Sequence, residues 1–186
     1  MTKHTLYFRF LQLTSGLLLL ALLLSSLPPI LPTRAWPGDM AADWVSDEIE
    51  DTRALAWADM DNDGDPDLAV GNWGQPLRVY RNDGGALTPV WSSVEISNTT
   101  SLAWGDYDGD GLPDLAVGNR GQPNRIYRNN GDDTFTPIWS SPETDPTTSV
   151  AWADWDDDGD LDLAVGNWAG PNHIYRNNGD GSFTLV

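Results

Sequence analysis

Apolar residues in this chain come in short runs that are separated by polar, acidic and glycine-rich segments. From residue 53 onward one kind of run ends in Trp (ALAW, SLAW and SVAW), and a second kind reads LAVGN. A third kind alternates apolar and polar side chains (LRVYRN, NRIYRN and NHIYRN). Short runs bounded by Gly, Pro, Asn and Asp are typical of β-strands, and no sustained helical period occurs. The pattern therefore predicts an all-β domain.

The whole pattern recurs three times. The Trp that ends the first run stands at Trp57, Trp104 and Trp152, which are 47 and 48 residues apart, and a fourth run (LTPVWSS, FTPIWSS) closes the first two copies. A period in the high forties with four short strands is typical of a β-propeller blade. We expect propeller-type blades of four antiparallel strands, in about three repeats. These repeats are residues 53–98, 99–148 and 149–186, the last one truncated.

An acidic loop separates the first two predicted strands of every copy. It reads DMDNDGDPD from Asp59, DYDGDGLPD from Asp106 and DWDDDGDLD from Asp154. Counted from the first Asp, carboxylates occupy positions 1, 3, 5 and 9, and position 6 is always Gly, which permits a sharp turn. Position 7 varies, as expected where only the backbone carbonyl is a ligand. Dense hard oxygen donors favour Ca²⁺ over Mg²⁺, so we expect about three Ca²⁺ ions, one per repeat.

The candidate metal ligands are the four carboxylates of each loop together with the residue at position 7. They are Asp59, Asp61, Asp63, Asp65 and Asp67; Asp106, Asp108, Asp110, Leu112 and Asp114; and Asp154, Asp156, Asp158, Asp160 and Asp162. An EF-hand would close its site with Glu at position 12. Position 12 is instead Val70, Val117 or Val165. The closing carboxylate is therefore expected at position 9, where a strand begins.

The D-x-D-x-D-G-x-x-D-L loop followed by LAVGN resembles the FG-GAP/VCBS repeats, which are similar to the blades of integrin α-chain propellers. The resemblance covers residues 53–186. It implies a Ca²⁺ ion held in the hairpin loop between the first two strands of each blade. It departs from the family in number, because a full propeller has about 4–8 blades and three repeats are present.

The N-terminus has the composition of a targeting segment. Basic Lys3 and Arg9 precede an apolar run over residues 17–24, and Thr33–Ala35 provides a small-residue cleavage site. The alternative is an uncleaved membrane anchor, but the apolar run is shorter than the roughly 20 residues of a span and prolines follow it. We expect residues 1–35 to be a signal peptide and the protein to be secreted, extracellular or at the cell surface, with no membrane insertion after cleavage.

Charge and residue content exclude several classes of function. The chain carries a net charge of −18 and no Cys, and removal of residues 1–35 would leave 7 basic and 28 acidic residues. Such a charge argues against nucleic acid and anionic membranes as partners. The single His beyond that segment, His173, aligns with Arg78 and Arg125 of the other copies, so we expect it to be a solvated strand residue. No combination of nucleophile, base and orienting group can be assembled, so we do not expect an enzyme.

Tryptophan is abundant, and most of it follows the repeat. Two repeat positions are occupied by Trp44, Trp91 and Trp139, and by Trp57, Trp104 and Trp152. Recurrent aromatic positions predict packing between blades. Trp73 and Trp168 follow the end of a strand, where the middle copy has Arg120. These two could stack on sugar rings or contact a protein, and plain surface packing is the alternative.

The repeat is cut unevenly at the two ends. Trp44 lies 13 residues before Trp57, so residues 36–52 are expected to hold a spare fourth strand and a linker. Residues 183–186 match 135–138 and stop short of the next Trp. Three explanations are open: a three-bladed ring closed within one chain, strand exchange that gives a homo-oligomer or polymer, or a fragment of a longer protein.

Three functions are compatible with these features. The first is a secreted Ca²⁺-binding repeat protein that acts as a structural, adhesion or self-assembly module. The second is a carbohydrate-binding, lectin-like propeller that uses Trp73 and Trp168. The third is the non-catalytic propeller part of a secreted hydrolase or lyase. A protein or a glycan is the ligand expected for such a module.

Overall fold

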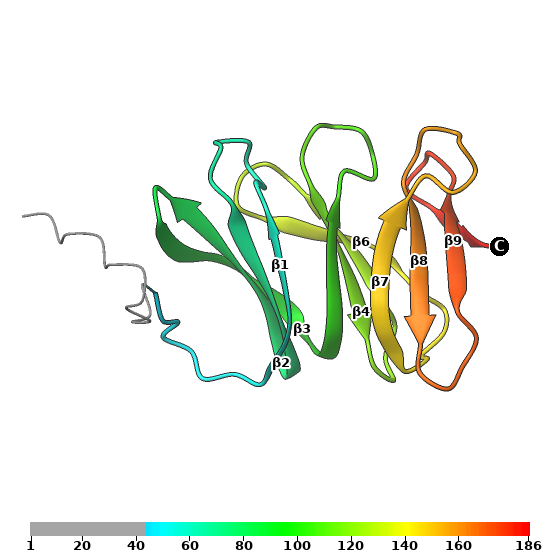
Figure 1. The fold of residues 1–186 in the computed structure, drawn as a ribbon, viewed down its shortest axis with the longest axis horizontal. Helices are drawn as coiled ribbons and strands as arrows, with labels where there is room; N and C mark the ends of the chain where they lie inside the picture. The colour runs from blue at the N-terminus through cyan, green and yellow to red at the C-terminus, as the bar shows by residue number, and fades with distance from the viewer. Residues whose placement is uncertain (1–43) are drawn as a thin grey trace, which may run out of the picture. The chain divides into compact units, whose positions relative to one another are not determined.

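The computed structural model describes residues 44–186, which form one compact unit. The predicted signal peptide and the first part of the predicted spare strand lie outside the described residues. Within residues 44–186 every regular element is a β-strand, as Figure 1 shows, and no helix long and apolar enough to cross a membrane is present there. The prediction of an all-β fold is confirmed.

Ten strands follow one another along the chain, all paired antiparallel. They are β1 (Thr52–Ala58), β2 (Asp67–Asp83), β3 (Ala86–Gly105), β4 (Asp114–Asn119), β5 (Arg125–Asn129), β6 (Phe135–Ser140), β7 (Thr147–Ala153), β8 (Asp162–Asn167), β9 (His173–Asn177) and β10 (Phe183–Leu185).

These strands make three successive units, which we call blades. Blade 1 contains β1, β2 and residues 86–98 of β3; blade 2 contains residues 99–105 of β3 with β4, β5 and β6; blade 3 contains β7 to β10. Each strand pairs with its neighbour in sequence, and the order in the last sheet is β10-β9-β8-β7. Figure 1 shows the blades side by side. Consecutive antiparallel strands are the arrangement expected within a propeller blade.

Blade 1 has longer strands than its sequence predicts. Strand β2 continues through Trp73–Pro76, where a Gly/Pro turn was predicted, because residues 73, 75 and 76 pair with residues 96–98 of β3. The corresponding segments of blades 2 and 3 are turns or bends. Gly74 has a φ of 67°, so the chain still bends at this point although the pairing is continuous.

Two of the three apolar clusters lie between blades, and the third lies within blade 1. Leu77 and Val79 of blade 1 pack in one buried cluster with Leu115, Tyr127 and Phe135 of blade 2. A second cluster joins blades 2 and 3 in the same manner. Because each strand is pleated, alternate side chains point to opposite faces of a blade. Each blade therefore depends on a neighbouring blade to bury its faces.

The spare fourth strand predicted within residues 36–52 is not seen in its described part, since residues 44–51 form no strand. A strand needs a partner, and no strand of a preceding blade is available among the described residues. Trp44 nevertheless contacts Tyr80 edge-on, with ring centroids 5.2 Å apart. Trp91 contacts Tyr127 in the same way at 5.4 Å, so Trp44 does occupy the place of its repeat equivalents.

Candidate metal centres

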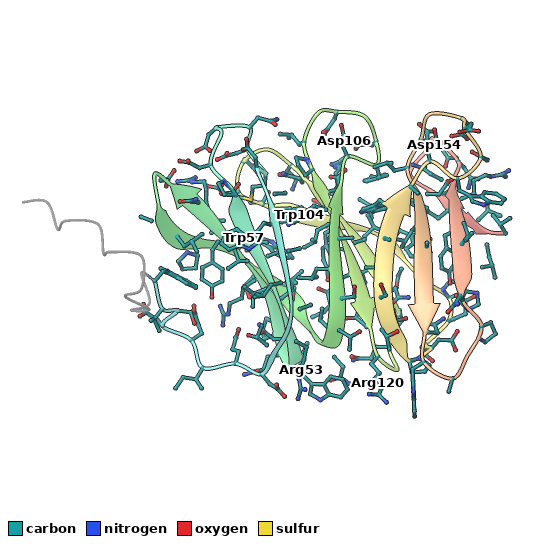
Figure 2. All side chains as sticks on the ribbon, viewed as in Figure 1. Arg53, Trp57, Trp104, Asp106, Arg120 and Asp154 are labelled. Atoms are coloured by element: carbon teal, nitrogen blue, oxygen red, sulfur yellow. The ribbon has the colours of Figure 1, made fainter. Side chains whose placement is uncertain are left out.

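The three acidic loops connect the first two strands of each blade. They join β1 to β2, β3 to β4, and β7 to β8. Figure 2 shows Asp106 and Asp154 in loops at one end of the blades, and Arg53 and Arg120 at the opposite end. The loops are thus presented side by side at a single edge of the molecule.

The first carboxylate of each loop organises the loop backbone. In blade 1 the two Asp59 oxygens accept hydrogen bonds from the N–H groups of Asp63 and Gly64, both at 3.0 Å. The equivalent bonds are 3.1 and 2.9 Å in blade 2, and both are 3.1 Å in blade 3. The Gly at position 6 has a φ of 97°, 92° and 99° in the three loops. This confirms the sharp turn predicted there.

The last carboxylate of each loop is buried and joins the loop to the blade. Asp67 is 0% exposed, and its oxygens accept hydrogen bonds from the N–H groups of Met60 at 2.8 Å and Asn82 at 2.7 Å. Asp114 and Asp162 make the same two contacts with positions 107 and 129 and positions 155 and 177. Position 9 therefore closes the loop from the start of a strand, as the sequence predicts.

Positions 1, 3 and 9 come together in every loop. One carboxylate oxygen from each lies within 4.8 Å of the others, and such a group could hold a metal ion. The three groups are Asp59, Asp61 and Asp67; Asp106, Asp108 and Asp114; and Asp154, Asp156 and Asp162. Clustered hard oxygen donors on a turning loop fit a divalent cation such as Ca²⁺.

Positions 5 and 7 are placed differently from the other predicted ligands. The position-5 residues Asp63, Asp110 and Asp158 are outside the three groups, and each accepts a hydrogen bond from the N–H group of position 7 at 2.8–2.9 Å. The Asp65 side chain accepts a hydrogen bond from Gly84 N–H at 2.8 Å. Its carboxylate is thus engaged with the next turn, and ligation by positions 5 and 7 stays a prediction.

The crowding of carboxylates affects their protonation. Burial is the main reason that the pKa of Asp114 is raised to about 7; two backbone N–H groups oppose the shift, and the charges of Asp108 and Asp110 add to it. Burial likewise raises the pKa of Asp67. Position 3 follows the same trend: the pKa of Asp61 rises through burial and through the charges of Asp63 and Asp59. A cation among these groups would stabilise their charged forms.

Two features of the loops were not foreseen from the sequence. Position 4 also adopts a left-handed conformation, with a φ of 60° at Asn62 and Asp157 and 73° at Gly109. The signal was present, since Asn, Asp and Gly are the residues that favour this conformation. The Asn of the Tyr-Arg-Asn triplets is the second feature, because its N–H group binds the buried Asp of the loop.

His173 replaces an arginine in an ion-pair position. Its ring nitrogen lies 3.0 Å from a carboxylate oxygen of Asp145, and its side chain is 15% exposed, which corrects the expectation of a solvated residue. Arg78 pairs with Glu50 at 2.7 Å, and Arg125 lies 3.5 Å from Glu95. The His is therefore part of a repeated structural contact.

The Tyr that follows this position meets a Glu in each blade. The hydroxyl of Tyr80 donates to Glu48 at 2.9 Å, that of Tyr127 to Glu95 at 3.2 Å, and that of Tyr175 to Glu143. Burial is the main cause that raises the pKa of these three phenols, and the partner carboxylate adds to it. The repeat pattern shows these Tyr residues, but it does not predict that each of them donates a hydrogen bond to a Glu.

A second candidate site lies at the end of the blades opposite the loops (Figure 2). Arg53, Trp73, Thr100 and Arg120 line a groove of about 400 Å³. The Arg53 guanidinium lies 5.9 Å from the Trp73 ring centroid, and that of Arg120 lies 5.1 Å from the Trp168 ring centroid. The Trp73 and Trp168 rings are therefore each covered in part by a cation.

Comparisons with known proteins agree with this architecture. The model of the FG-GAP-like repeat matches residues 59–117, 106–165 and 154–186. No curated protein matches the chain. The crystal structure of BBS1N in complex with ARL6DN, soaked with lead, is similar over 75% of this chain, with a TM-score of 0.50 and 18% identity. The chain spans 43% of the length of that protein. This likeness concerns the fold alone and supports a β-propeller-type repeat module.

Proposed function

The chain belongs to the FG-GAP-like repeat family, and on this premise we propose that it is a secreted, calcium-binding propeller module with a structural role in adhesion or assembly. One observation carries the proposal: the same three carboxylates meet within 4.8 Å in each of three loops. Their supporting hydrogen bonds also recur from loop to loop. Three carboxylates held this close repel one another, and a ligand with a high positive charge would offset that repulsion.

Calcium is the ion that the donors favour. The carboxylates of positions 1, 3 and 9 supply hard oxygen ligands, and position 5 with the carbonyl of position 7 would extend the set toward the 6–8 oxygens that Ca²⁺ takes. Cys is absent from the chain and no His lies in the loops, so the soft and nitrogen donors that zinc and copper prefer are missing. A bound Ca²⁺ would supply positive charge and fix the loop conformation.

Secretion and a non-catalytic role complete the proposal. The basic and apolar start of the chain supports export, and an export route fits a Ca²⁺-dependent protein because free Ca²⁺ is high outside cells. The loop carboxylates are hydrogen-bonded to backbone N–H groups of their own loops. Groups committed to a loop and a metal are poorly available for proton transfer, so we infer a scaffold rather than an enzyme.

Calorimetric titration of Ca²⁺ into chelator-treated protein tests the proposal. We expect about three ions per chain for the unmodified protein. Asp162→Asn should reduce the number to about two, because position 9 belongs to the carboxylate group of the third loop. Asp157→Asn is the matched control: it removes a charge from the same loop at a position that is Asn62 in the first loop. Absence of heat and of bound ion at millimolar Ca²⁺ would contradict the proposal.

The groove at the opposite end supports a second candidate, the binding of an acidic carbohydrate. Its two guanidinium groups can pair with a carboxylate or sulfate, and the Trp73 ring offers an apolar face to a sugar. Glycan-array binding that is lost in Trp73→Ala and Arg120→Ala, with Ca²⁺ stoichiometry unchanged, would support this candidate. Equal signals for the variants and the unmodified protein would dismiss it.

A further inference from the structure

Each blade packs against the preceding blade through the same directed contacts. The indole N–H of Trp104 in blade 2 donates to the carbonyl of Ala56 in blade 1 at 3.1 Å. Trp152 in blade 3 donates to Ala103 in blade 2 at the same distance. The following blade thus supplies the donor and the preceding blade supplies the acceptor.

A second hydrogen bond also recurs at both interfaces between blades. The side-chain amide of Asn129 donates across the interface to the carbonyl of Met60, and that of Asn177 donates to Tyr107, both at 2.8 Å. Apolar side chains surround these bonds in two buried clusters. The interface between blades is therefore a repeated unit with a donor face and an acceptor face.

Within residues 44–186 the donor face of blade 1 is only partly covered, since Leu68, Val70 and Tyr80 are buried in a cluster of their own. Trp57, the equivalent of Trp104 and Trp152, is 56% exposed, and Leu55 beside it is 60% exposed. Leu55 lines a groove of about 490 Å³ together with Leu68, Val70 and residues of the segment 44–52. The Asn82 amide uses one hydrogen to bind the carbonyl of Pro66 at 3.0 Å. An amide has two hydrogens, and its equivalents use the other for the cross-blade bond.

Residues 44–50 already supply one edge of what a preceding blade would provide. Trp44 packs on Tyr80, and Glu48 accepts the Tyr80 hydroxyl hydrogen bond at 2.9 Å. The Arg78 guanidinium pairs with Glu50 at 2.7 Å. These contacts repeat those that blade 1 makes with blade 2 through Trp91 and Glu95. What the groove lacks is the apolar surface of strands two and three of a preceding blade.

The acceptor face of blade 3 is likewise only partly covered among the described residues. Trp155 stands where Tyr107 is buried in blade 2, and it is 52% exposed. Ala164 is exposed, whereas its equivalents Ala69 and Ala116 are both 0% exposed. Val186 is 62% exposed, whereas its repeat equivalent Ile138 packs against the second apolar cluster. Blade 3 therefore exposes the kind of surface that blade 1 would contact in a preceding blade.

We propose that blade 3 of one copy of the protein packs against blade 1 of a second copy, head to tail, through the interface that joins successive blades within the chain. In this contact Trp57 of the second copy donates to the carbonyl of Ala151 of the first copy, and Asn82 of the second copy donates to the carbonyl of Trp155 of the first. Because the two faces differ, the contact is heterologous: it closes a ring of two copies if the rotation permits, or continues as a filament. The inference rests on the assembly role proposed above and names its partner.

Charge sets the conditions for this contact. The chain is strongly acidic, with 28 acidic and 10 basic residues, so two copies repel one another at low ionic strength. The two faces themselves are apolar, and salt at physiological strength screens charges beyond about 8 Å. Association should therefore strengthen when salt rises from low to physiological concentration.

Analytical ultracentrifugation of the purified protein in physiological salt and calcium tests the contact. We expect dimers or longer assemblies for the unmodified protein. Trp57→Arg and Ala164→Arg should each lose most of the assembled species. Both should keep the melting temperature that the unmodified protein has at a concentration where it is monomeric, because both side chains are exposed in the single chain. Val94→Arg is the control, since Val94 is 96% exposed and lies outside both faces.

Mixing the two variants gives a sharper test. Each retains the face that the other has lost, so the mixture should form dimers although neither variant does so alone. This rescue is expected only for a head-to-tail contact. A monomer for the unmodified protein, or an assembly that both variants leave intact, would overturn the inference. A monomer that still binds three Ca²⁺ ions would leave the calcium proposal standing.

Discussion

At the scale of single residues, the side chain at position 9 of each loop has two roles. It belongs to the cluster that could hold a cation, and its oxygens also bind N–H groups of the loop and of the third strand of the blade. Its burial raises the pKa of Asp114 to about 7. The loop is thereby attached to the sheet through the group that an ion would bind, so occupancy and blade stability are coupled.

The turn at position 6 gives a prediction that separates strain from crowding. Gly111 has a φ of 92°, and a Cβ there would meet nothing within 4 Å. Gly111→Ala should still destabilise the protein by about 1–3 kcal/mol, because a side chain is strained in this conformation. Thermal unfolding with matched calcium measures the effect. Gly109→Asn is the control and should be nearly neutral, since Asn62 adopts a φ of 60° at the same loop position.

Much of the candidate site could be predicted because the clustering of carboxylates in a loop depends on residue type and spacing. Positions 1, 3 and 9 of the loops come together as the sequence predicts. The role of Asn82 and its equivalents could not be predicted in the same way. The equivalents Asn129 and Asn177 use their amides across an interface, toward residues about 70 positions earlier in the preceding blade. Sequence spacing within one repeat carries no information on such partners.

At the scale of elements, blades are held at a close distance that leaves no room for side chains at one strand position. A Cβ on Gly118 of β4 would lie 2.9 Å from side-chain carbons of Thr147 and Val150 in β7. Gly71 in β2 is crowded in the same way by Thr99, at 2.5 Å. The Gly of the LAVGN run is therefore an interface residue, which its place in a strand did not reveal.

This crowding predicts opposite outcomes for two equivalent glycines. Gly118→Ala should destabilise the protein by about 1–3 kcal/mol through overpacking, which lowers the melting temperature by several degrees. Gly166→Ala should be neutral or slightly stabilising, because the nearest atom to its Cβ would be 3.6 Å away on Ser149 of the same blade. Melting of both variants, measured at a concentration where the protein is monomeric, checks the difference. Equal losses would show that the strand, and not the interface, requires Gly.

The division into strands could be predicted where the hydrophobic pattern decides it. The four-stranded blades follow from the alternation of apolar runs and turns, and β4 to β10 match it. The continuous β2 and β3 could not be foreseen, because pairing across Trp73–Pro76 depends on a partner about 20 residues away. The lack of a strand at residues 44–51 has a similar cause: the described residues offer this strand-like sequence no partner strand.

At the scale of the whole molecule, apolar packing and acidic charge work against each other. Two of the apolar clusters lie between blades, and the acidic loops of all three blades lie at the same edge, as Figure 2 shows for two of them. Carboxylates gathered at one edge repel one another across neighbouring loops as well as within them. Asn62 of one loop donates to the Gly111 carbonyl of the next at 2.9 Å. The first two loops are thus connected directly, and the three loops together form a strongly negative surface.

Removal of calcium should therefore destabilise the whole unit. At a Ca²⁺ concentration about tenfold above the Kd, each site contributes roughly 1.4 kcal/mol, so three sites contribute about 4 kcal/mol. For a domain of this size each kcal/mol corresponds to about 2–4 °C, so EGTA should lower the melting temperature by about 10 °C. Added Mg²⁺ should restore little of it, since Mg²⁺ keeps its waters and requires octahedral geometry.

The control for this experiment is a variant in which the ions have no site. In the triple substitution of Asp67, Asp114 and Asp162 by Asn, EGTA should leave the melting temperature unchanged, because each carboxylate group of the loops is broken. The variant should melt below the calcium-bound protein, since the ions no longer stabilise it. An unmodified protein that melts at the same temperature with and without EGTA would contradict the structural role of calcium, because the loops would then be held by their hydrogen bonds alone.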